Sequence, residues 1–196
     1  TSSGGGGTGG ATGVSMCQGK EIPAGDLPLS ADGRSVVVPC LEQALSLSVI
    51  DPAIVRLTHD LQDGARASYA VVAEAAGALP VIGGSAETAI ICTEELLIEV
   101  DRGSCRVRAT DRLGNVLLES PEGGGGVSKQ GEARAVRWEA APGERYYGFG
   151  EKTGGLDKHG RKLVFYNTDA YDAAFRGYPP DADPLYASIP FFVGLR

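Results

Sequence analysis

The stretch TAIICTEELLIEVDRGSCRVRATDRLGNVLLE, residues 88–119, decides the fold that the sequence predicts. Short apolar or alternating segments follow one another in it, and residues typical of turns separate them. The expected strands are 89–91, 96–100, 105–110 and 116–118. Short strands at this spacing are typical of an antiparallel sandwich or barrel.

Further β patterns flank this stretch on both sides. Alternating or β-branched residues predict strands at 45–49, 54–58 and 135–139. Residues 66–78 are ambiguous, because their alanines favour a helix while Ser68–Val72 favours a strand, and we read them as a strand. The sequence therefore predicts an all-β protein, an antiparallel β-sandwich that runs over 19–196.

The N-terminal stretch has a different composition. Residues 1–15 are almost entirely Gly, Ser and Thr, which bury too little apolar surface to become ordered. We therefore expect a disordered low-complexity tail over 1–18.

The C-terminal stretch 146–196 is rich in aromatic and turn-forming residues. Of the aromatic residues in the chain, only Tyr69 lies outside 138–192. Aromatic rings are the surfaces on which sugars and bases stack, and loops rich in Gly, Pro, Asn and Asp often carry binding groups. We therefore expect the binding residues in this stretch.

Several motifs in this stretch have a specific order and spacing. They are YGFGE at 147–151, GGLD at 154–157 with Gly160-Arg161, NTDAY at 167–171 and DPLYASIPFF at 183–192. In these motifs the chain resembles the N-terminal domain of glycoside hydrolase family 31, the α-glucosidase and α-xylosidase family. Fainter similarity, of strand pattern only, extends back to about Leu45. The resemblance implies a galactose-mutarotase-like β-sandwich, which in that family precedes a catalytic (β/α)8 barrel, and the chain stops where that barrel would begin.

Asp169 is the candidate substrate-binding residue. It follows the apolar segment 163–166, which we expect to be a strand, and a carboxylate at a strand exit can accept hydrogen bonds from two adjacent sugar hydroxyls. The resemblance implies that the matching Asp holds the substrate over the barrel mouth. The alternative is that Asp169 only caps a turn through backbone N–H groups. Spacing alone favours the cap, and the motif favours sugar contact.

Other residues near Asp169 have open roles. Tyr171, Phe175 and Tyr178 either wall a substrate entrance or pack the loop 170–183, and Arg176 is a candidate for bonding hydroxyls. Glu151 is interpreted as structural, with its carboxylate bonded to backbone or to Lys152.

We expect no catalytic residue in the chain itself. A retaining glycosidase needs two carboxylates about 5–5.5 Å apart. The resemblance places both on the barrel, one in a W-x-D-M-type motif that Trp138 does not match. Nothing in the sequence holds Asp169 with Asp172, or Asp181 with Asp183, as a replacement pair. The nucleotide-loop pattern is not met after Gly148, and no metal or cofactor is expected.

Charge and hydropathy narrow the class of partner. The formal net charge of −7 and the pI near 4.9 argue against a nucleic acid. No apolar run is long enough for a membrane helix. The expected partners are an α-glucoside or related oligosaccharide and the chain's own catalytic barrel.

The cysteines suggest a location. Cys17, Cys40, Cys92 and Cys105 are widely spaced, with no metal-binding pattern. We expect four reduced, buried thiols in a cytoplasmic protein, with a Cys92–Cys105 bridge as the alternative if their strands are neighbours.

Three functions compete. The first is the supporting and carbohydrate-binding domain of a retaining α-glycosidase that hydrolyses terminal α-linked glucose or xylose, inactive on its own. The second is a stand-alone carbohydrate-binding or mutarotase-like module, for which His59 and His159 are the only histidines available. The third is a structural domain whose aromatic segment docks another domain.

Overall fold

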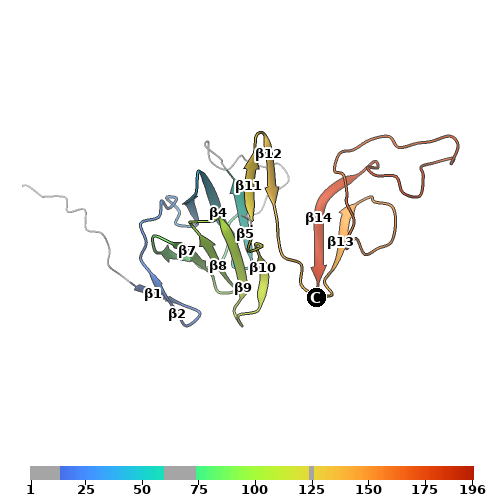
Figure 1. The fold of residues 1–196 in the computed structure, drawn as a ribbon. Coiled ribbons are helices and arrows are strands. Elements are labelled where there is room, and N and C mark those ends of the chain that lie inside the picture. Colours follow the sequence, from blue (N-terminus) through green and yellow to red (C-terminus); the bar gives the residue numbers. More distant parts are fainter. Residues whose placement is uncertain (1–13, 60–73, 124–125) are drawn as a thin grey trace, which may run out of the picture. The chain divides into compact units, whose positions relative to one another are not determined.

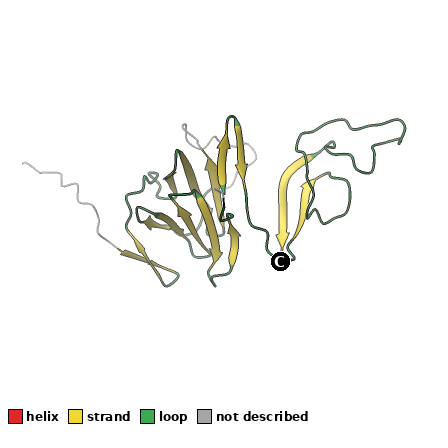
Figure 2. Ribbon diagram, in the orientation of Figure 1, coloured by secondary structure: helices red, strands yellow, loops and turns green. Residues whose placement is uncertain are grey.

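The computed structural model describes residues 14–59, 74–123 and 126–196 (Figure 1). The chain divides into two units, Thr1–Glu139 and Ala140–Arg196, and each is described here by itself. Figure 2 shows strands joined by loops and turns, and no helix occurs within these described ranges. The strands pair antiparallel throughout them. The all-β antiparallel prediction is confirmed.

A five-stranded meander is the main sheet of the first unit. Its strands follow the order β10-β9-β8-β7-β6. They are β6 (Val81–Gly84), β7 (Thr88–Cys92), β8 (Leu96–Asp101), β9 (Arg106–Asp111) and β10 (Val116–Glu119). The β9–β10 turn is set by Asp111, whose Oδ1 accepts hydrogen bonds from the backbone N–H groups of Leu113 and Asn115, both at 2.8 Å. The strands expected from residues 88–119 are thus present, with β6 added at one edge.

A three-stranded sheet packs against one face of the meander. It consists of β3 (Ser35–Cys40), β4 (Gln43–Asp51) and β5 (Ile54–His59), in that order. Leu45, Leu47 and Val49 of β4 are buried, and the residues between them are less so, as the period-two pattern predicts. The core they share with the meander includes Ala89, Ile91, Ile98, Val100 and Val107. Two sheets packed face to face in this way form a β-sandwich.

A hairpin covers the opposite face of the meander. It consists of β1 (Val14–Cys17) and β2 (Lys20–Pro23). Ile22 of the hairpin is buried with Ile90, whereas the next residue of β7, Ile91, belongs to the main core. Successive residues of a strand point to opposite faces, so β7 contributes to both layers.

The approach of the hairpin requires a residue without a side chain on β6. A Cβ atom at Gly83 would lie 2.2 Å from the backbone oxygen of Pro23, well inside van der Waals contact.

The expected disordered tail over 1–18 is wrong for residues 14–17. These residues form β1, because their backbone pairs with that of β2. Residues 1–13 lie outside the described part of the chain.

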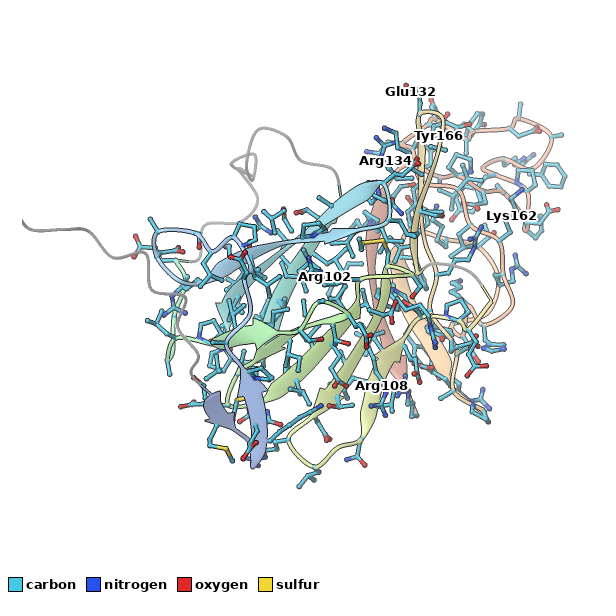
Figure 3. The ribbon with its side chains drawn as sticks, turned by 60° about the vertical axis from the view of Figure 1, so that its left-hand side comes forward. Arg102, Arg108, Glu132, Arg134, Lys162 and Tyr166 are labelled. Carbon is cyan, nitrogen blue, oxygen red and sulfur yellow. A yellow bond between two sulfur atoms is a disulfide. The ribbon has the colours of Figure 1, made fainter. Side chains whose placement is uncertain are left out.

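The four cysteines form two disulfides, Cys17–Cys92 and Cys40–Cys105 (Figure 3). The first ties the hairpin to β7, and the second ties β3 to the residue just before β9. The expectation of four reduced thiols is wrong, and so is the alternative Cys92–Cys105 bridge. The partners are 75 and 65 residues apart in sequence, and packing of the layers brings them together.

The remaining strands form two hairpins. In the first unit, β11 (Val127–Gln130) pairs with β12 (Ala133–Val136), so the strand expected at 135–139 begins and ends earlier. In the second unit, β13 (Arg145–Gly150) pairs with β14 (Ser188–Leu195). Residues 163–166 form no strand, contrary to prediction. The ambiguous segment 66–78 lies mostly outside the described residues, and its described end, 74–78, contains no strand.

Opening the Cys40–Cys105 disulfide should destabilise the first unit. A cross-link over 65 residues lowers the entropy of the unfolded chain, by an amount worth about 4 kcal/mol in the loop-closure model. We expect Cys40→Ser/Cys105→Ser to lower the free energy of unfolding by that order in a urea titration. By the same model, Cys17→Ser/Cys92→Ser, which opens a loop of 75 residues, should lower the free energy of unfolding by a similar amount. An unchanged urea midpoint in the Cys40/Cys105 variant would contradict the prediction.

Candidate functional site

The second unit begins with a bulged hairpin that sets the position of residues 151 and 152. Pairing between β13 and β14 shifts register between Gly148 and Gly150, and the intervening Phe149 has a φ of 72°. A Cβ atom at Gly150, where φ is 78°, would lie 2.5 Å from the backbone oxygen of Ala187. Only glycine fits there without strain. The YGFGE motif is thus explained by a bulge in the strand.

Lys152 is the centre of the polar contacts that follow this bulge. Its side chain is fully buried, and its Nζ donates to Asp183 Oδ1 at 2.8 Å and to Ser188 Oγ at 3.3 Å. It also donates to the backbone oxygen of Val164 and lies 4.6 Å from the ring centroid of Phe165. One ammonium group therefore joins several segments of the second unit that are distant in sequence.

Asp183 completes this arrangement from the other side. Its Oδ2 accepts a hydrogen bond from the Val164 N–H at 2.7 Å. Burial of Asp183 raises the pKa of its carboxyl, but the bonds from Lys152 and Val164 and the nearby charges of Lys152 and Arg161 outweigh it and hold that pKa below the ordinary 3.8. Both polar backbone groups of Val164 are bonded to side chains, which is why residues 163–166 do not pair as the expected strand.

Hydrogen bonds then align the segment before Asp169 with residues 185–188. The Thr168 N–H donates to the Leu185 oxygen at 3.1 Å, and the Ser188 N–H donates to Asn167 Oδ1 at 2.8 Å. The Ser188 hydroxyl donates to the Tyr166 oxygen at 3.1 Å. Leu185 is itself buried and anchors its segment. Asn167 of the NTDAY motif thus fixes the backbone that carries Asp169.

Asp169 is exposed and has a donor from its own turn. Its Oδ1 accepts a hydrogen bond from the Tyr171 N–H at 3.1 Å, which is the turn cap that spacing alone favoured. The interaction with Asp169 raises the pKa of Tyr186 above its ordinary 10. An ionised carboxylate has about four lone-pair sites, so the bond from Tyr171 leaves acceptor capacity for a ligand. The cap and a binding role are therefore compatible.

The loop after Asp169 carries exposed aromatic rings. Asp172 and Gly177 form an isolated bridge that closes a tight turn, and Asp172 Oδ1 accepts from the Ala174 N–H at 2.8 Å. Tyr171, Phe175 and Tyr178 are all exposed within the second unit. Their role at a substrate entrance stays a prediction.

Glu151 and His159 have local partners. The Ala187 N–H donates to Glu151 Oε2 at 3.3 Å, so the expected bond between the Glu151 carboxylate and the backbone is present. The exposed His159 ring stacks on Tyr146, with centroids 5.9 Å apart.

Within the described residues, no group of three or more His, Cys, Asp and Glu side chains is placed to hold a metal. Nor does any helix in the described ranges have the length and apolarity to cross a membrane.

The sequence indicated Asp169 as a candidate but did not indicate the buried pair of Lys152 and Asp183. Asp183 lies in the DPLYASIPFF motif, directly before Pro184 and the buried Leu185, and this position was the available signal. Its partner Lys152 is distant in sequence, so the pairing itself was not predictable.

Comparisons with known proteins agree with this architecture. Residues 44–196 match the family model described as the glycosyl hydrolase 31 N-terminal galactose mutarotase-like domain. The chain is 32% identical over 129 residues to Alpha-glucosidase 2 of Bacillus thermoamyloliquefaciens, a match that covers 66% of this chain and 16% of that protein.

Solved structures show the same fold. A GH31 dextranase of Flavobacterium johnsoniae, complexed with glucose, has a TM-score of 0.69 at 22% identity, over 88% of this chain and 21% of that one. A GH31 alpha-xylosidase from Xanthomonas citri has a TM-score of 0.63 at 19% identity, over 85% and 18%. The chain thus spans about a fifth or less of the length of these relatives.

Removing the Lys152 ammonium should loosen the second unit. In Lys152→Met the Asp183 carboxylate is left buried without its cation, a loss that typically costs about 3–5 kcal/mol. We expect amide hydrogen exchange in the second unit, at Val164 and Ser188 above all, to accelerate by the corresponding factor. Exchange in the first unit should stay as in the wild type.

Lys162→Met is the matched control, because Lys162 is an exposed lysine of the same unit (Figure 3). It should leave exchange rates unchanged. Equal exchange in the two variants would show that the buried ion pair does not hold the unit together.

Proposed function

Because the chain belongs to the glycosyl hydrolase 31 family, as its N-terminal galactose mutarotase-like domain, we propose that it supports a retaining α-glycosidase acting on terminal α-linked glucose or xylose. The observation that carries the proposal is the geometry at Asp169. Its carboxylate is exposed, is held by the Tyr171 N–H, and belongs to a loop with exposed aromatic rings. Such a loop suits a polar ligand with a ring-shaped apolar face.

The relatives support a sugar as the ligand. The Flavobacterium johnsoniae dextranase is complexed with glucose, and a mutant of it with isomaltotriose. The Xanthomonas citri relative is an alpha-xylosidase. For the present chain we therefore propose an α-glucoside or related oligosaccharide, with Asp169 accepting hydrogen bonds from adjacent hydroxyls. Each such charge-assisted bond is worth roughly 1.5–3 kcal/mol.

In this proposal the bond-breaking carboxylates belong to another part of the enzyme. A retaining mechanism needs a nucleophile and an acid/base group at about 5–5.5 Å, held rigidly with separated pKa values. Asp169 and Asp172 are both exposed on a loop, and the carboxylate of Asp183 is bound to Lys152. We therefore assign Asp169 to substrate binding, assign chemistry to a catalytic barrel, and expect this chain alone to be inactive.

The surface of the second unit supports a barrel as partner. Several large apolar side chains on β14 are exposed, namely Ile189, Phe191, Phe192, Val193 and Leu195. A sheet strand with this much exposed apolar surface is typical of a surface that another part of the protein covers. We propose that the catalytic barrel of the same enzyme covers it.

The compartment is a separate proposal. The cytoplasmic expectation depended on unpaired thiols, whereas the four cysteines form two disulfides. Disulfides persist mainly in oxidising compartments, so the two bridges favour the alternative that the chain folds outside the cytosol.

Alkylation of the protein in intact native cells should label none of its cysteines before reduction and all of them afterwards. Labelling without reductant would favour the cytoplasm.

Asp169→Ala should lower kcat/KM of the complete gene product on an α-glucoside such as isomaltotriose. Losing two charge-assisted bonds predicts a decrease of about a hundredfold or more. The matched control is Asp181→Ala, since Asp181 is an exposed carboxylate of the same loop. Unchanged kinetics in Asp169→Ala would reject the proposed binding role, as would an equal loss in the control.

A further inference from the structure

The two disulfides of the first unit differ in their exposure. Cys40 and Cys105 are 2% and 0% exposed, so their bridge is enclosed within the sandwich. Cys92 is also buried, but its partner Cys17 is only half-buried. A thiolate must touch a sulfur atom to exchange with a disulfide, so access decides which bridge reacts. Of the four cysteines, Cys17 is the one that such a reagent reaches most readily.

A surface hollow of about 380 Å³ borders both cysteines of the Cys17–Cys92 bridge. Cys17 and Gln18 of the hairpin line one part of it. Cys92 of β7, Glu94 of the following turn and Leu79 of the segment before β6 line the rest. A hollow of this volume has room for a small organic thiol.

The Cys17–Cys92 bridge lies at the tip of the β1–β2 hairpin, directly before its two-residue turn (Figure 1). Two further contacts hold this tip. Gln18 Nε2 donates to the Thr93 backbone oxygen at 2.9 Å, and Lys20 forms an ion pair with Glu99 of β8. Partly exposed contacts of these kinds each contribute about 1 kcal/mol or less. The disulfide is therefore the main attachment of the tip to the meander.

The hairpin covers an apolar cluster of its own. Ile22, Ile90 and Cys92 are buried in it, and Val81 and Leu97 pack against them. The larger core lies on the other face of the meander and does not include these residues. A segment with few buried apolar contacts opens at a lower free energy than the main core. The hairpin can therefore leave the meander while the sandwich stays folded.

We propose that the Cys17–Cys92 bridge is a thiol-reactive site: a small dithiol reaches it through the hollow, opens it before the other bridge and so releases the hairpin. One thiolate of the reagent attacks Cys17 Sγ to form a mixed disulfide, and Cys92 leaves as a thiolate that takes a proton from water. The second thiolate of the reagent attacks the reagent's own sulfur in the mixed disulfide. Cys17 leaves and is protonated in turn.

The exchange is balanced between protein and reagent. The protein disulfide gains two electrons and becomes two thiols, and the dithiol loses two electrons and becomes a cyclic disulfide. An oxidised dithiol reverses both steps and closes the bridge again. The proposal is independent of the function proposed for Asp169, because it concerns the first unit alone.

Partial reduction of the complete gene product with dithiothreitol tests the order of opening. N-ethylmaleimide traps the thiols as they form, and peptide mass spectrometry identifies the labelled cysteines. We expect Cys17 and Cys92 to be labelled at least about tenfold faster than Cys40 and Cys105, because the enclosed bridge exchanges only after the main core opens. Equal rates, or earlier labelling of Cys40 and Cys105, would overturn the proposal.

Glu94 tests the route through the hollow. It is an exposed carboxylate on the lining, and the attacking thiolate is also negative. Glu94→Lys should therefore accelerate opening of the bridge about two- to fivefold at low ionic strength, and less in 1 M salt.

Glu122→Lys is the matched control for charge. Glu122 is an exposed glutamate of the same unit that borders a different hollow. Its substitution should leave the rate of opening unchanged. Equal rates in the two variants would show that the reagent does not pass Glu94 and would overturn the proposed route.

Hydrogen exchange shows whether the hairpin is released. With the bridge reduced, amides of β1 and β2 should exchange at nearly the rate of an unfolded peptide, while those of β8 and β9 remain protected. Cys17→Ser/Cys92→Ser should give the same pattern without any reagent. A hairpin that stays protected in this variant would show that the disulfide does not hold it, and the proposal would fail.

Discussion

The buried ion pair between Lys152 and Asp183 is the interaction on which the second unit depends. Its ammonium and carboxylate groups connect the end of β13, the backbone of Val164 and the start of β14. Removing two charges from water is costly, and here the cost is offset because each of these groups also has a neutral hydrogen-bond partner. The pair has an organising role: it specifies which loop segments lie side by side.

The two units are stabilised by different physics. In the first, two apolar clusters fill the spaces on either side of the meander, and each disulfide joins two layers. In the second, over residues 140–196, Leu185 is the only hydrophobic side chain that is fully buried. Its loops are held by hydrogen bonds and ion pairs instead. A polar framework of this kind leaves aromatic rings and the Asp169 carboxylate at the surface.

Much of the first unit was predictable from its sequence, and less of the second. Alternation along β4 and β9 showed which residues face the core, because the period of a strand links sequence directly to burial. The segment 163–166 has the composition of a strand but does not form one, since side chains satisfy the backbone of Val164. The ion pair of Lys152 with Asp183 was not predicted, because it joins segments that only the folded chain brings together.

The sequence by itself determined the fold class, the family and the stretch that contains the candidate site. These properties follow from local periodicity, turn chemistry and the order of short motifs, all of which act between near neighbours in the chain. The tertiary structure decided which cysteines pair, that residues 14–17 belong to the folded part, and what supports Asp169. Those features depend on contacts between residues far apart in sequence, which form only when the sheets and loops have packed.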